Sequence, residues 1–117
     1  MMLAKLQQKF TYLIMVLISF AYENGYLLTF GEAWRPQETA DLYAKKGIGS
    51  KNSLHCRRLA VDFNLFRGEE YLTETEHYRE LGEYWESLGT PEIKTCWGGR
   101  FSKGDGNHFS IEYEGRR

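Results

Sequence analysis

The 117-residue chain is long enough for about one domain with a modest core. Hydrophobic residues make up 42% of it and aromatic residues 15%, which is typical of a folded protein and excludes a disordered chain. A formal net charge of -1 gives no basis for nucleic-acid binding, and the pair Arg116-Arg117 is too short to change that balance.

The N-terminal segment has the composition of an export signal but the pattern of a core helix. Lys5 and Lys9 precede an apolar stretch, residues 12–21, which is too short to span a bilayer and is not followed by a small-residue cleavage site. One helical stripe contains Phe10, Leu13, Ile14, Leu17 and Ala21. Gly25 then stands where a C-cap belongs. We therefore expect a core helix, no stable membrane insertion and synthesis in the cytoplasm.

The next elements are a strand and a second helix. Residues 26–34 predict a strand in which Gly31 marks a bulge or a close backbone approach. Pro36 suits the first turn of a helix that continues to about Lys46 and ends at Gly47. A polar loop then leads to the first of the candidate site residues.

Two later strands each have one apolar face. In residues 59–66 the apolar side chains alternate with Asp62 and Asn64, and in residues 108–113 they alternate with a polar set that begins at His108. If these strands are neighbours, Asp62 and His108 converge without any special backbone strain.

The remaining pattern completes the predicted fold. Residues 73–76 have the form of a capping box that opens a third helix, which ends at Gly89. A short strand around 94–97 and a glycine-rich loop, 98–107, follow. The sequence predicts an α+β fold with a small, mainly antiparallel sheet and about three helices packed on one side, in one domain over residues 1–117.

Four residues have the composition of a catalytic metal site. His55, Asp62 and His108 supply two imidazoles and a carboxylate, and three protein ligands leave the fourth position that a catalytic zinc site keeps open. Asp105 is a spare carboxylate that could act as general base and then general acid in hydrolysis. From spacing alone, a metal site and a chance grouping of common residues remain alternatives.

Three motifs carry a resemblance to a known family. They are Ser53-x-His55-x-x-x-x-Ala60-x-Asp62, Trp97-Gly98-Gly99 and Asp105-x-x-His108-Phe109. Over roughly Phe30–Ile111 the chain resembles the zinc peptidases of the D-Ala-D-Ala carboxypeptidase and dipeptidase (VanY-like) family, which includes L-alanyl-D-glutamate endopeptidases used as phage endolysins. The resemblance implies a Hedgehog/D-Ala-D-Ala peptidase-like fold and one Zn²⁺ per chain. It also implies His55, Asp62 and His108 as the ligands, with Asp105 as the catalytic carboxylate.

The resemblance adds candidates around these ligands. An arginine after the early strand polarises the scissile carbonyl or holds a substrate carboxylate in this family, which points to Arg35; the alternative is a surface arginine beside a helix N-terminus. Weaker candidates for substrate contact are Ser53, Gln37 and Trp97, whose alternatives are loop capping, a solvated helix position and the core. Arg58 stands where the family often has glycine, which puts the local loop shape in question.

The sequence therefore predicts a zinc metallopeptidase that hydrolyses a peptidoglycan stem-peptide bond, with L-alanyl-D-glutamate as first choice. We expect a monomeric phage or prophage endolysin that reaches the cell wall after release, with bacterial peptidoglycan as its partner. The alternatives are a D-Ala-D-Ala carboxypeptidase or dipeptidase and a non-catalytic, zinc-stabilised wall-binding or phage structural module. The spare carboxylate of Asp105 argues against the last. Cys56 and Cys96 are expected as small packed side chains rather than a disulfide.

Overall fold

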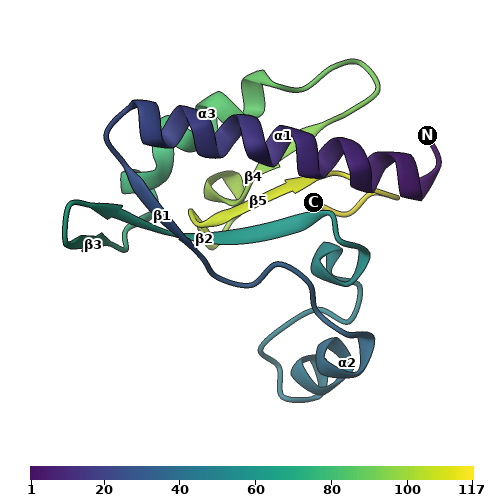
Figure 1. Ribbon diagram of the computed structural model, residues 1–117. Helices are drawn as coiled ribbons and strands as arrows, with labels where there is room; N and C mark the ends of the chain where they lie inside the picture. The colour runs from purple at the N-terminus through teal and green to yellow at the C-terminus, as the bar shows by residue number, and fades with distance from the viewer.

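Short apolar strands form one five-stranded antiparallel sheet in the computed structural model, which describes residues 1–117 (Figure 1). The strands are β1 (Leu27–Phe30), β2 (Ala60–Arg67), β3 (Glu70–Leu72), β4 (Thr95–Trp97) and β5 (His108–Ile111). Strand β2 is the longest and pairs with β1, β3 and β5, while β4 pairs with β5. The two strands that carry Asp62 and His108 therefore lie side by side in the sheet, which is the condition under which the sequence predicts that these residues converge.

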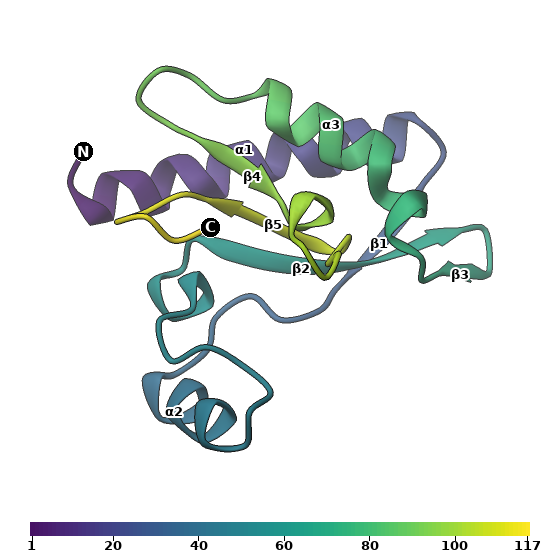
Figure 2. The same ribbon diagram turned by 180° about the vertical axis from the view of Figure 1, so that it is seen from behind.

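Three α-helices and three 3₁₀ turns connect these strands. They are α1 (Leu3–Glu23), α2 (Gln37–Lys45), η1 (Leu54–Arg57), η2 (Thr75–Tyr78), α3 (Arg79–Ser87) and η3 (Gly98–Arg100). Helices α1 and α3 lie together against one face of the sheet (Figures 1 and 2). Between these layers lies one hydrophobic cluster of 20 buried residues. This arrangement confirms the predicted α+β class.

The N-terminal segment forms the core helix that the apolar stripe predicted. Its buried residues are Leu6, Phe10, Ile14, Leu17 and Ala21. The helix ends in a Schellman motif, in which Gly25 has a φ of 83° and the amide of Tyr26 donates to the carbonyl of Ala21 at 3.0 Å. None of the helices combines the length and the apolar character that crossing a bilayer requires.

Helix α2 differs from the expectation that all the helices pack on one side. It lies beyond the other face of the sheet, away from α1 and α3 (Figure 2). The reason is its composition, because Ala40 is its only buried residue and the other positions are mostly polar. A helix without a broad apolar stripe has no face to bury in the main core.

Two local predictions also change. The turn after β2 leads into the short strand β3, which the sequence did not predict. The capping box before α3 is made by Glu74 and His77 rather than by Thr73 and Glu76, and the His77 ring nitrogen Nδ1 accepts a hydrogen bond from the Glu74 amide at 3.1 Å. His77 therefore caps η2.

The first predicted strand is shorter than expected because it ends in a bulge. The Gly31 amide donates to the Asp62 carbonyl, and the Asp62 amide donates to the Glu32 carbonyl, both at 2.8 Å. Two residues of one strand thus oppose a single residue of β2, which is a β-bulge. A Cβ on Gly31 would lie 3.1 Å from the Asp62 carbonyl oxygen, so the close approach predicted at this glycine is confirmed.

Candidate metal centre and catalytic cleft

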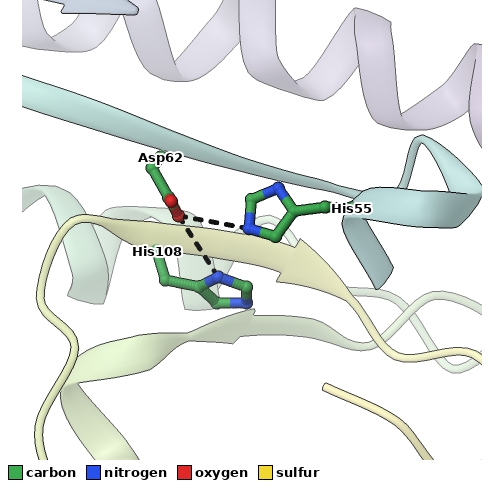
Figure 3. A group of neighbouring side chains, drawn as sticks. All are labelled: His55, Asp62 and His108. Carbon is green, nitrogen blue, oxygen red and sulfur yellow. Dashed lines mark ion pairs between the residues drawn. The ribbon is translucent and has the colours of Figure 1, made fainter. Parts of the chain in front are cut away.

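Two of the candidate ligands are directly opposite each other in the sheet. The antiparallel register of β2 and β5 pairs Asp62 with His108, so their side chains project from the same face. His55 reaches the same point from η1, just before β2. The His55 Nε2 and His108 Nδ1 atoms each lie 3.4 Å from Asp62 Oδ1 (Figure 3). The structure therefore brings together the three residues that the sequence singled out as ligands.

The spacing of these atoms fits a shared cation better than direct hydrogen bonds. Ordinary N–H···O hydrogen bonds are about 2.7–3.2 Å long. Ligand atoms about 2.0–2.2 Å from a tetrahedral zinc ion lie roughly 3.3–3.6 Å from one another, which matches the two measured separations. Asp62 Oδ1 is also buried without a hydrogen-bond partner. The donor set and its geometry thus fit Zn²⁺.

Groups around the ligand cluster fix the orientation of the His55 ring. His55 Nδ1 lies 3.2 Å from the Ala33 carbonyl oxygen, which directs Nε2 toward the ligand cluster. Ser53 Oγ accepts a hydrogen bond from the His55 amide at 3.2 Å and caps η1. The His55 carbonyl in turn accepts from the Arg35 amide at 3.2 Å. The segment after the bulge therefore holds His55 in position.

Electrostatics at the cluster favours the charged forms of its members. Burial opposes ionisation of Asp62, but the two flanking imidazoles outweigh it and lower the pKa of this carboxyl to about 2. Burial of His55 would lower its pKa, whereas the interaction with Asp62 raises it above the ordinary value. The Asp62 carboxylate is thus kept anionic, as a metal ligand must be, and a divalent cation would bind the two imidazoles in their neutral form and displace their protons.

Asp105 lies in the loop before β5 and lines the same cleft as the three ligands. Its amide donates to the Gly98 carbonyl at 2.9 Å, and its carbonyl accepts from the His108 amide at 3.1 Å. Partial burial raises the pKa of the Asp105 carboxyl; the negative charge of Asp62 acts in the same direction, while His108 opposes it. A carboxyl with a raised pKa is suited to both accepting and returning a proton.

Arg35 also lines the cleft, and its main partner was not predicted. The Arg35 guanidinium forms an ion pair with Glu32, with Nε at 3.0 Å from Oε1, and this hydrogen bonding raises the pKa of Arg35. Glu32 is the second residue of the bulge, so the bulge sets the position of the pair. No spacing rule identifies Glu32 from the sequence, because Glu32 and Arg35 lie outside a helix, where residues three apart do not regularly face each other.

The cleft has a volume of about 430 Å³. Its lining residues are Arg35, Ser50, Asn52, Ser53, Leu54, His55, Asp62, Phe101, Asp105, His108, Gly115, Arg116 and Arg117. Two of the weaker candidates lie outside it. Gln37 donates to Asp41 Oδ1 at 3.0 Å and to the Lys51 carbonyl at 2.8 Å, so it fastens α2 to the following loop. Trp97 is buried in the core.

Arg58, which stands where the family often has glycine, adopts the left-handed conformation that glycine would favour, with a φ of 56°. Its guanidinium lies 4.5 Å from the centre of the Trp34 ring. Arg58 lines an apolar pocket with Trp34 and residues of α1, and it does not line the cleft that contains the ligand set.

Both cysteines are free thiols, with Cys96 buried and Cys56 half-buried, as expected.

Comparison with known proteins assigns the chain to a family. The family model described as D-alanyl-D-alanine carboxypeptidase matches residues 46–111, which is more than half of the chain. Among solved structures, the L-Ala D-Glu endopeptidase ChiX from Serratia marcescens has the same fold, with a TM-score of 0.68 and 18% identity over 90% of this chain and 79% of that one. A search of curated proteins finds no match. The chain therefore belongs to the D-alanyl-D-alanine carboxypeptidase (VanY-like) family of peptidases.

Proposed function

We propose that this protein is a zinc-dependent peptidoglycan peptidase that hydrolyses the L-alanyl-D-glutamate bond of the stem peptide. The observation that carries the proposal is the cluster of His55, Asp62 and His108 in an open cleft that also contains Asp105. A structural metal site has its ligands closed around the ion and needs no further carboxylate. Three ligands with a second carboxylate, that of Asp105, in the same cleft are instead suited to hydrolysis.

Each functional group of the cleft has a separate role in the proposed reaction. When bound, a zinc ion supplies a Lewis acid that polarises a carbonyl and lowers the pKa of water. The Asp105 carboxylate takes a proton from the attacking water and returns it to the leaving amine, and its raised pKa suits both transfers. Arg35 donates hydrogen bonds to the scissile carbonyl oxygen or to a substrate carboxylate, while Glu32 holds its guanidinium in place.

Two candidate bonds in the stem peptide follow from different observations. The family description favours the terminal D-Ala-D-Ala bond as the alternative substrate. The fold shared with an enzyme described as an L-Ala D-Glu endopeptidase supports the internal bond, which is the one we propose. Both reactions use the same zinc chemistry, so only the products distinguish them.

Mass spectrometry of purified peptidoglycan after digestion tests the proposal. We expect new D-glutamate amino ends, whereas loss of terminal D-alanine would identify the carboxypeptidase. Asp105→Asn should retain zinc but lose at least about a hundredfold in rate, the scale of general acid–base catalysis. His55→Ala should lose zinc as well as activity, and Glu69→Gln, which removes a charge from an exposed turn, should change neither. Zinc-loaded protein that releases no product would refute an enzymatic function.

The biological setting is part of the same proposal. We propose that the enzyme is made in the cytoplasm of a host cell and degrades the wall during phage or prophage lysis. Cells that express the chain should then remain intact until chloroform permeabilises the inner membrane, and lyse after it. Expression of Asp105→Asn is the matched control, and it should give no lysis after the same treatment. Lysis without permeabilisation would instead indicate that the chain is exported.

A further inference from the structure

One wall of the cleft consists of cationic side chains that the proposed reaction does not use. Residues 113–116 form a tight hairpin in which Tyr113 and Arg116 exchange two backbone hydrogen bonds of 2.9 and 3.0 Å. The two residues at its tip, Glu114 and Gly115, have φ values of 49° and 78°. Two consecutive left-handed residues reverse the chain sharply, as in a type I′ turn. The reversal returns Arg116 and Arg117 to the cleft, which both of them line.

Contacts across the cleft fix where Arg117 lies relative to the ligands. Its guanidinium carbon lies 5.4 Å from the centre of the Phe101 ring. The Phe101 ring centre lies 5.3 Å from that of His108. Phe101 thus contacts both Arg117 and the proposed ligand His108 in one cleft, so a substrate held at the ligand cluster would lie along this ring beside the arginine.

Arg116 and Arg117 are also available for an external anion. Neither forms an ion pair within the chain. By contrast, Arg35, Arg79 and Arg100 are all paired with glutamates. Guanidinium groups present a planar pair of donors that matches a carboxylate. Two such groups on one wall of a cleft are therefore suited to a substrate that carries a free carboxylate.

We propose that Arg116 and Arg117 form a carboxylate-binding subsite that selects stem peptides with a free acid next to the scissile bond. The inference rests on the proposed function, because it assigns these arginines a role in recognising the same substrate. The selected group is the α-carboxylate of the D-glutamyl residue. The corresponding primary amide has no negative charge and accepts only at one oxygen, so it binds more weakly.

Two synthetic stem peptides that differ only in this group, free acid or primary amide, provide the test. The zinc-loaded 117-residue chain should cleave the acid about five- to tenfold more efficiently in kcat/KM, the effect expected of solvent-accessible charged hydrogen bonds. The double variant Arg116→Ala/Arg117→Ala should lose most of this preference, because KM rises more for the acid than for the amide. Arg116→Lys/Arg117→Lys should keep part of the preference for the acid, because the positive charge remains.

The matched control is Lys5→Ala/Lys9→Ala, which removes two exposed charges from α1 on the other side of the sheet. It should keep the full preference for the acid, and thermal unfolding should show that every variant is folded. Equal cleavage of both peptides by the unmodified chain, or a preference that survives in the double alanine variant, overturns the subsite and leaves the proposed function intact. Failure to cleave either peptide or whole peptidoglycan overturns the proposed function and the subsite with it.

Discussion

At the scale of single residues, glycines make room for the Trp97 ring beside the loop that carries Asp105. A Cβ on Gly82 or on Gly99 would overlap this ring, so both positions require the smallest residue. The Trp97 Nε1–H donates to the Gly106 carbonyl at 2.7 Å, which fixes the loop that carries Asp105. Trp97 thus supports the site from the core, although it does not line the cleft.

Gly98 should be required for activity. A Cβ at this position would overlap the Asp105 carbonyl oxygen and lie 2.7 Å from His108 Cβ, and backbone atoms cannot move aside cheaply. Gly98→Ala should destabilise the fold by about 1–3 kcal/mol and reduce both zinc content and hydrolysis. Metal analysis and thermal unfolding measure these effects. The control is Gly47→Ala, where nothing lies within 4 Å but φ is 72°, so it should lose some stability through backbone strain while keeping zinc and activity. Normal activity in Gly98→Ala would show that the loop geometry is not needed.

At the scale of elements, α1 is held by one buried stripe while its outer face is exposed. Leu17 is fully buried on this helix, whereas Met15 is 52% exposed two residues away. Leu17→Ala should lower the free energy of unfolding by about 2–5 kcal/mol, because it removes apolar contacts and leaves a cavity. Met15→Ala should change it by less than about 0.5 kcal/mol. Urea unfolding of both variants provides the measurement; equal effects would mean that α1 does not pack as described.

The elements that the sequence predicts best are those with a long, regular pattern. The stripe of α1 and the alternation around Asp62 and His108 each extend over several residues, so local spacing alone identifies the buried face. Strand β3 has three residues, too few for an alternation to be recognised. The cap at Glu74 was missed because a histidine completes the box, where the usual pattern has glutamate or glutamine.

The residues of the candidate site also differ in how well the sequence predicts their positions. Its ligand set follows from residue types and their strands, because register brings Asp62 and His108 together. The positions of Gln37, Glu32, Arg116 and Arg117 could not be predicted from spacing. Their positions depend on a bulge, on where α2 lies and on a left-handed conformation at Glu114, a residue type that rarely adopts it.

At the scale of the whole molecule, the proposed zinc ion would connect η1 with the two central strands of the sheet. Binding to the folded state alone stabilises it by about 4 kcal/mol when the ion is at a thousand times its Kd. That is a large share of the roughly 5–15 kcal/mol typical of a domain. Adding zinc to chelated protein should therefore raise Tm by roughly 10–20 °C, as differential scanning calorimetry can measure. His108→Ala should lack most of this increase, and an unchanged Tm in the unmodified chain would contradict a metal that joins these elements.

The segment between β1 and η1 has a consequence for how the substrate preference of this protein could change in evolution. It contains α2, which has one buried residue, and it is fastened to the sheet at the Gly31–Glu32 bulge and by the Arg35–His55 backbone hydrogen bond. Three of its last residues, Ser50, Asn52 and Ser53, line the cleft. Doubling the length of such a loop costs only about 0.6 kcal/mol in closure entropy. Insertions here could reshape substrate choice over evolution while the reaction centre remained unchanged.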